Sequence, residues 1–203
     1  MKPLLLLMRH GETDLNKNKE FRGWDDPVLN EDGFREARDA KSFLKRFRIN
    51  LVVHSDMKRT TQMAETIGIK PMEADHRLRP LNVGVFAGQK KTPATTKMFD
   101  YYLANRGRKI PQGESINDFE QRYEPVLREG VEYGESGKLA LFSVHTSNII
   151  AAQNLLTGIE RNEEKGNLLK PGGVAGVFRE GNKYVVKALF KPETGREASD
   201  QVW

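Results

Sequence analysis

Residues 3–13 read Pro-Leu-Leu-Leu-Leu-Met-Arg-His-Gly-Glu-Thr, the stretch of the chain that is most informative about its architecture. Residues 4–8 are apolar without interruption, which is typical of a strand buried on both faces of a parallel sheet. The run is too short for a signal-peptide core and far too short to cross a bilayer. It ends at Arg9, His10 and Gly11, so the sequence predicts a histidine at the carboxyl end of a buried strand.

Two further stretches repeat this pattern of a buried strand followed by a helix. Residues 51–53 and 139–144 are short apolar runs, and the second ends at His145. We expect three capped helices among these strands. The first is capped by Asn30, the second is capped by Ser55 or Asp56 and ends at Gly68, and the third is capped by Ser147 and ends at Gly158. Strands that alternate with helices predict an α/β fold with a parallel sheet.

The rest of the chain predicts a capped helix, an edge hairpin and two irregular segments. Ser115 and Asp118 match a capping box, and Pro125 is expected to kink or end the helix that follows. Residues 174–178 and 184–190 predict an antiparallel hairpin at the sheet edge. Residues 89–112 predict an irregular basic insertion or lid, and a polar, loosely held tail starts near residue 191. No linker or repeat divides the chain, so we expect one domain over residues 1–203.

The composition favours a reducing compartment and an anionic partner. The chain has no cysteine, which excludes disulfides, thiolate nucleophiles, iron–sulfur clusters and cysteine-containing zinc sites, and we expect a cytoplasmic protein. Its formal charge is +5, from 33 basic and 28 acidic residues. A net positive charge attracts anions. The basic residues are interspersed with acidic ones, however, and no nucleic-acid-binding motif accompanies them. A small phosphorylated substrate explains the same charge.

Four residues at strand ends predict a site for phosphoryl transfer. His10 and His145 each follow a buried strand, Arg9 adjoins His10, and Arg59 lies in the first turn after the second strand. In open α/β sheets, ligands bind beyond the carboxyl ends of the strands, where helix N-termini attract anions. Histidine can act as a covalent nucleophile, and arginine binds two oxygens of a phosphoryl group in one plane. No metal or organic cofactor is needed for such a transfer.

Each of these residues alone has a plainer interpretation. A lone Arg-His-Gly occurs by chance, a histidine such as His145 is often a buried structural residue, and Arg59 on a helix face is often a solvated charge. Their joint placement at three strand ends favours the functional interpretation. Spacing identifies no partner for His54 or His76, so we assign them no role.

Several blocks of the sequence form a recognisable series between residue 4 and about residue 158. They are Arg9-His10-Gly11-Glu12-Thr13, then Asn16, Arg22-Gly23, Asp26-Pro27, Leu29 and Gly33, then residues 55–62 and 111–115, and finally His145. In content and order these blocks resemble the histidine phosphatase superfamily, in its phosphoglycerate mutase-like branch.

The resemblance implies a fold and a set of roles. The fold is a three-layer α/β/α sandwich with a mostly parallel central sheet. His10 would become phosphorylated, and Arg9, Arg59 and His145 would hold the phosphoryl oxygens. The substrate side would be lined by Asn16, Arg22 and Gly23, and also by Thr146, which adds a hydroxyl where the family commonly has glycine.

One departure affects the chemistry. The family usually places a glutamate that acts as general acid four residues before the glycine corresponding to Gly84, but this chain has Pro80 there. The missing acid predicts a preference for phosphates with stable leaving groups. Alternatively, the acid is supplied by Asp75, Glu73 or Glu114.

The sequence therefore predicts a metal-independent phosphatase that acts on a small phosphorylated substrate through a phosphohistidine on His10. Two alternatives remain open, namely a phosphoglycerate mutase-type transfer and a catalytically weak module that binds phosphorylated ligands. We expect neither a specific nucleic-acid partner nor a membrane partner, and the sequence predicts neither the natural substrate nor the oligomeric state.

Overall fold

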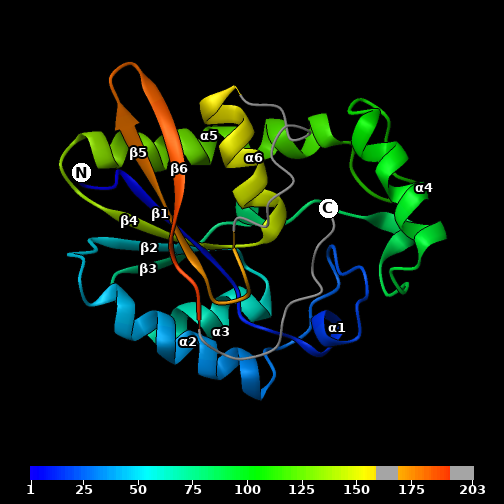
Figure 1. The fold of residues 1–203 in the computed structure, drawn as a ribbon, viewed down its shortest axis with the longest axis horizontal. Helices are drawn as coiled ribbons and strands as arrows, with labels where there is room; N and C mark the ends of the chain where they lie inside the picture. The colour runs from blue at the N-terminus through cyan, green and yellow to red at the C-terminus, as the bar shows by residue number, and fades with distance from the viewer. Residues whose placement is uncertain (159–168, 193–203) are drawn as a thin grey trace.

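The computed structural model describes residues 1–158 and 169–192, and Figure 1 shows their arrangement. Its central feature is a sheet of six strands in the order β3-β2-β4-β1-β5-β6. The strands are β1 (Leu5–Arg9), β2 (Leu51–His54), β3 (Met72–Ala74), β4 (Ala140–Val144), β5 (Val174–Glu180) and β6 (Lys183–Phe190). The helices are α1 (Asp14–Lys17), α2 (Glu31–Leu44), α3 (Lys58–Ile67), α4 (Pro93–Ala104), α5 (Ile116–Glu135) and α6 (Thr146–Thr157), and two short 3₁₀ turns lie at His76–Leu78 and Gly84–Phe86.

The sheet is mostly parallel, as predicted. Strand β4 lies between β1 and β2 and is parallel to both, and β3 is parallel to β2. Strand β5 is antiparallel to β1 and to β6, so the predicted hairpin does form the edge of the sheet. The carboxyl ends of β1, β2 and β4 consequently meet at one edge.

Strand β1 separates two hydrophobic cores, because its side chains alternate between the faces of the sheet. Leu5 and Leu7 pack into the core beneath α5 and α6, whereas Leu6 and Met8 pack into the core against α2 and α3. All four side chains are fully buried. The uninterrupted apolar run therefore serves two cores at once, and the fold is the predicted α/β/α sandwich.

Two predicted helix caps are wrong. Helix α3 starts at Lys58 after Met57, without a side-chain cap, because the Asp56 carboxylate accepts two hydrogen bonds from the Arg79 guanidinium instead. Helix α6 starts at Thr146, directly after His145, because Ser147 lies inside the helix and its hydroxyl accepts a hydrogen bond from the Leu81 N–H. The caps at Asn30 and Ser115 and the helix ends at Gly68 and Gly158 are confirmed.

Two expectations about helices are corrected by the structure. Helix α5 continues through Pro125 to Glu135 rather than ending there, and buried residues such as Tyr123 and Leu127 flank the proline on the core side. The segment 89–112 is not irregular throughout, because it contains helix α4, which begins with a capping box at Thr92 and has Pro93 in its first turn. The predicted polar tail lies mostly outside the described residues.

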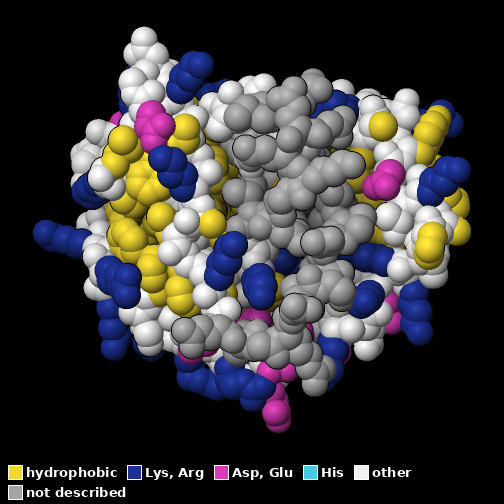
Figure 2. Space-filling model, viewed as in Figure 1, with side chains coloured by type: hydrophobic (Ala, Val, Ile, Leu, Met, Phe, Trp, Pro, Cys, Tyr) yellow, Lys and Arg dark blue, Asp and Glu magenta, His cyan; other side chains and the backbone are white. Residues whose placement is uncertain are grey.

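The described surface has no continuous basic stripe on the face shown in Figure 2, where Lys and Arg side chains are separated by neutral and acidic ones. Hydrophobic side chains gather on this face over the β5–β6 hairpin and over α4, where Met98 and Tyr101 are exposed. None of the described helices combines the length and the apolar character that a membrane span requires.

Candidate active site

The parallel pairing of β1 with β4 brings His10 and His145 together. Arg9 lies opposite Val144 in the register, so the next residue of each strand is a histidine. The His10 N–H donates to the Val144 carbonyl over 3.0 Å, and the two imidazole centroids lie 5.2 Å apart. Both side chains are buried.

The imidazole of His10 is held in one tautomer. Its Nδ1 lies 2.7 Å from the Gly11 carbonyl oxygen, which can only accept, so Nδ1 carries the proton and Nε2 keeps its lone pair. Burial is the main cause that holds the pKa of His10 well below its ordinary value of 6.5. The positive charges of Arg59, Arg22 and Arg9 lower this pKa further, in that order. The ring is therefore neutral at physiological pH and has a free lone pair.

The imidazole of His145 is held in the opposite tautomer. The Arg59 Nε–H donates to Nδ1 of His145 over 3.2 Å, so the ring proton is on Nε2. This Nε2 is buried and has no hydrogen-bond partner among the described residues. Burial, followed by the charge of Arg59, holds the pKa of His145 well below its ordinary value. His145 can therefore donate a hydrogen bond to a bound oxygen while His10 attacks the atom that bears it.

Arg59 links the site to the loop before α2. Its Nη2 donates to the Gly23 carbonyl over 3.0 Å, and its Nη1 donates to the Asp25 carbonyl over 2.8 Å and lies 3.9 Å from the Asp26 carboxylate. Burial lowers the pKa of Arg59 to about 10, an effect that Asp26 and Asp25 oppose. The guanidinium therefore stays charged at neutral pH and supplies fixed positive charge beside both histidines.

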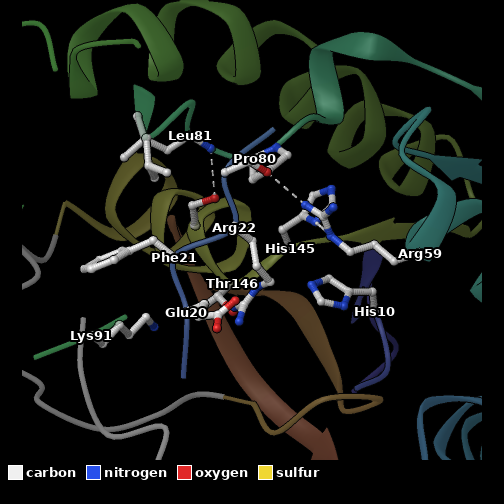
Figure 3. A pocket seen from close by; sticks show the side chains of 13 residues that line it. His10, Glu20, Phe21, Arg22, Arg59, Pro80, Leu81, Lys91, His145 and Thr146 are labelled. Carbon is white, nitrogen blue, oxygen red and sulfur yellow. Dashed lines mark hydrogen bonds between the residues drawn. The ribbon is translucent and has the colours of Figure 1, made fainter. Parts of the chain in front are cut away.

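These groups surround one pocket, shown in Figure 3. Six of the residues singled out from the sequence line it: His10, Arg22, Gly23, Arg59, His145 and Thr146. The space within the pocket amounts to about 400 Å³, a figure that includes the open solvent at its mouth. The buried Thr146 hydroxyl has no hydrogen-bond partner among the described residues, so it is available to a ligand.

Two predicted site residues, Arg9 and Asn16, are not among the residues that line the pocket. Arg9 donates from Nη1 to the Leu169 carbonyl over 2.9 Å, and its charge acts on His10. Asn16 lies in α1, where its Oδ1 accepts hydrogen bonds from the N–H and the hydroxyl of Thr13 and closes a capping box. Asn16 thus stabilises the loop that follows His10.

Pro80 does line the pocket, at the position where the resemblance implies an acid, and its backbone is firmly held. Its carbonyl accepts hydrogen bonds from the Trp24 indole over 3.0 Å and from Arg122 Nη2 over 3.2 Å. Arg122 Nη1 also binds the carbonyls of Arg77 and Arg79, so one guanidinium fixes most of this loop. No side chain of the loop brings a proton donor to the pocket in place of the missing glutamate.

None of the three carboxylates proposed as substitutes lines the pocket. Glu73 is exposed on β3, and Glu114 is bound on both oxygens by the Arg122 guanidinium. Burial raises the pKa of Asp75, but hydrogen bonds and the charge of Arg77 outweigh it and hold this pKa below its ordinary value. A lowered pKa is the opposite of what a general acid needs.

Sequence reasoning missed several residues of the pocket wall, namely Glu20, Phe21, Leu81, Val83, Lys91 and Ser147. Lys91 belongs to the segment 89–112, and its ammonium lies 5.4 Å from the centre of the Phe21 ring. Other cations of that segment are turned to α5, where Arg106 pairs with Glu120 and Lys109 pairs with Asp118. Glu20 stands two residues before Arg22, and this proximity was the only sequence signal that Glu20 lines the pocket. Among the described residues, no group of three or more His, Asp or Glu side chains is arranged to hold a metal ion.

The chain is similar to known proteins over most of its length. The model of the histidine phosphatase superfamily, branch 1, matches residues 5–191. A protein named "Probable phosphoglycerate mutase GpmB" from Yersinia pestis (strain Pestoides F) is 30% identical over 166 residues, which cover 78% of this chain and 77% of that protein. The same-named protein of Erwinia tasmaniensis is 28% identical with the same coverage.

Solved structures agree in fold. The structure of a phosphoglycerate mutase from Thermus thermophilus has a TM-score of 0.69 and 26% identity, covering 92% of this chain and 96% of that chain. A mycobacterial glucosyl-3-phosphoglycerate phosphatase in complex with VO3 has a TM-score of 0.76 and 24% identity, covering 91% and 96%. The resemblance noted in the sequence is thus confirmed, and this chain belongs to the histidine phosphatase superfamily, branch 1.

Proposed function

We propose that the protein is a phosphatase that hydrolyses a small phosphorylated substrate through a phosphohistidine on His10. The observation that carries this proposal is the state of the His10 ring. Its Nδ1 is bound to the Gly11 carbonyl, so the neutral ring offers the Nε2 lone pair to a pocket with positive charge on its walls. A covalent phosphoryl acceptor requires this combination of a free lone pair and nearby cations.

The remaining groups have complementary roles in this proposal. As Nε2 of His10 attacks phosphorus, negative charge develops on the equatorial oxygens. Arg59 and Arg22 stabilise it with fixed positive charge, Nε2–H of His145 donates a hydrogen bond, and Arg9, whose charge acts on His10, adds to the positive potential. Gly23 and the Thr146 hydroxyl line the substrate side, and Asn16 holds the loop behind His10. Water then attacks the phosphohistidine and releases phosphate.

The proposal needs neither a metal nor a cofactor, because arginines and histidines supply the charge stabilisation that metal ions provide in other phosphatases. A reaction of this kind suits a cytoplasmic enzyme, and the absence of cysteine is compatible with that compartment. We accordingly expect full activity in the presence of EDTA.

A mutase is the second candidate, and the names of the curated relatives favour it. A mutase must return the phosphoryl group to the substrate and exclude water in the meantime. Supplying 3-phosphoglycerate and measuring 2-phosphoglycerate against free phosphate distinguishes the two reactions. Predominant isomer formation would replace the phosphatase proposal, and binding without either product would favour a catalytically weak phosphate-binding module.

The test of the phosphohistidine is direct. The protein is mixed with 4-nitrophenyl phosphate in EDTA, quenched in alkali, and examined by mass spectrometry for a phosphoryl group on His10. We expect the wild type to form this adduct and release phosphate, whereas His10→Ala should fold normally and do neither. His76→Ala is the matched control, because this histidine is exposed and lies outside the pocket. Turnover by folded His10→Ala within tenfold of the wild type, only about 1.4 kcal/mol of barrier, would contradict the proposal.

A further inference from the structure

One carboxylate lines the pocket among the described residues, and it belongs to Glu20. The Glu20 side chain is only partly exposed. Its carboxylate has no hydrogen bond and no ion pair within the described part of the chain, although cations such as Arg22 and Lys91 line the same pocket. Glu20 therefore differs from Glu114 and Asp75, whose oxygens are already bound by arginines.

The backbone holds Glu20 in a defined position. Its N–H donates to the Leu15 carbonyl over 2.9 Å, and it forms an isolated antiparallel bridge with Lys90. The next residue, Phe21, donates to the Gln89 carbonyl over 2.9 Å. Two segments about 70 residues apart in sequence therefore fix this carboxylate beside the pocket.

The position suits a group that acts on the leaving oxygen. In an in-line transfer the leaving group departs on the side of phosphorus opposite the attacking Nε2 of His10. His10, Arg22 and Glu20 line the same pocket, and in the view of Figure 3 the Arg22 side chain is drawn between His10 and Glu20. An in-line transfer requires the phosphoryl group to lie between the His10 nucleophile and the Glu20 carboxyl.

We propose that Glu20 is the general acid and base of this enzyme, replacing the acid that is absent at Pro80. The inference rests on the phosphohistidine mechanism proposed above. It also revises the expectation of a preference for phosphates with stable leaving groups, because that expectation assumed a site without an acid.

The proposed reaction has two steps. Nε2 of His10 forms a bond to phosphorus as the bond from phosphorus to the leaving oxygen breaks, and that oxygen takes the electron pair and the proton of the Glu20 carboxyl. In the second step the Glu20 carboxylate accepts a proton from water while the water oxygen attacks phosphorus. The P–N bond breaks, its electron pair returns to Nε2, and the products are phosphate and the protonated carboxyl.

The test uses leaving groups of different basicity. Single-turnover rate constants for phosphorylating His10 are measured with 2,4-dinitrophenyl, 4-nitrophenyl and phenyl phosphate. In the Glu20→Gln variant we expect a loss of about 10²–10⁴-fold with phenyl phosphate, the range of general acid catalysis, and a much smaller loss with 2,4-dinitrophenyl phosphate. The wild type should show a shallow dependence on leaving-group pKa. Glu73→Gln, which removes an exposed carboxylate outside the pocket, should behave as the wild type.

The outcomes separate this inference from the proposed function. An equal loss with all three substrates would assign Glu20 to binding or structure and overturn the inference. A steep dependence in the wild type that Glu20→Gln leaves unchanged would show a site that works without an acid, and would overturn it too. Absence of phosphohistidine in the wild type with every substrate would refute the mechanism itself, and the role of Glu20 with it.

Discussion

Replacing Arg59 by lysine tests how far the site depends on one planar side chain. Three nitrogens of Arg59 donate to three acceptors: Nδ1 of His145, the Asp25 carbonyl and the Gly23 carbonyl. A lysine ammonium cannot reach positions spread around a guanidinium, so we expect two acceptors to lose their donor. An unsatisfied buried group costs about 1–3 kcal/mol. Since the hydrogen bond to the Asp25 carbonyl is only partly buried, we expect the free energy of unfolding to fall by about 2–3 kcal/mol.

The same substitution should slow catalysis even though it keeps the positive charge. Without the Nε donor, the His145 ring is no longer held with its proton on Nε2, so the hydrogen bond to the phosphoryl oxygen is weakened. Removing one such donor typically costs about 10²–10³-fold in rate. Urea unfolding measures the stability, and single-turnover phosphorylation by 4-nitrophenyl phosphate measures the rate.

Arg128→Lys provides the matched control. Arg128 is exposed and pairs with Glu124 one helical turn away, and such pairs contribute less than about 1 kcal/mol. This variant should keep the stability and the rate of the wild type. If Arg59→Lys were as stable as this control and phosphorylated His10 within threefold of the wild-type rate, the planar fork would not be required and the reasoning would be wrong.

Two further predictions concern stability. Burial lowers the pKa of His10 and of His145, so below pH 6.5 the unfolded chain binds protons that the native protein does not. The free energy of unfolding should therefore fall as the pH drops below 6.5, by up to about 1.4 kcal/mol per pH unit for each histidine. Urea midpoints from pH 7 to pH 5 should fall less steeply in the double variant His10→Asn/His145→Asn, and parallel curves would contradict this. Gly84→Ala should cost about 2–4 kcal/mol, since Gly84 has φ +48° and a Cβ there would lie 2.0 Å from the Pro111 carbonyl oxygen. Gly137→Ala is the control, because Gly137 has φ +87° but no atom lies within 4 Å of the added Cβ, and it should cost only about 1–2 kcal/mol. If thermal or urea unfolding gave the same loss for Gly84→Ala and Gly137→Ala, the contact with Pro111 would not matter.

The sequence predicted the elements whose signal lies within a few neighbouring residues. The apolar runs of β1 and β4 predicted buried strands, and the order of strands and helices along the chain was enough to place the histidines that follow them at one sheet edge. Strand β3 was not predicted, because its three residues at the sheet edge are partly or fully exposed and show no apolar pattern. Helix α4 was not predicted although it has a local cap at Thr92, because the basic residues around it are typical of an irregular exposed segment.

The parts of the site that escaped prediction depend on contacts between distant segments. Glu20 reaches the pocket through its bridge to Lys90, and nothing in the sequence around either residue indicates that pairing. Likewise, serine is a common helix cap, but the Ser147 hydroxyl accepts a hydrogen bond from the N–H of Leu81, which is distant in the sequence. Local patterns therefore predicted the histidines and arginines at the strand ends more readily than the residues of the pocket wall that depend on distant contacts, such as Glu20 and Ser147.

The register between β1 and β4 determines both the packing of the two cores and the position of His10 relative to His145. A slip of one residue along this ladder would exchange the side chains destined for the two cores, and it would also move His10 out of step with His145. Molecules in the wrong register would thus be both unstable and inactive. Inserting or deleting one residue between Leu4 and His10 should for the same reason abolish both stability and activity, even where the inserted residue is apolar.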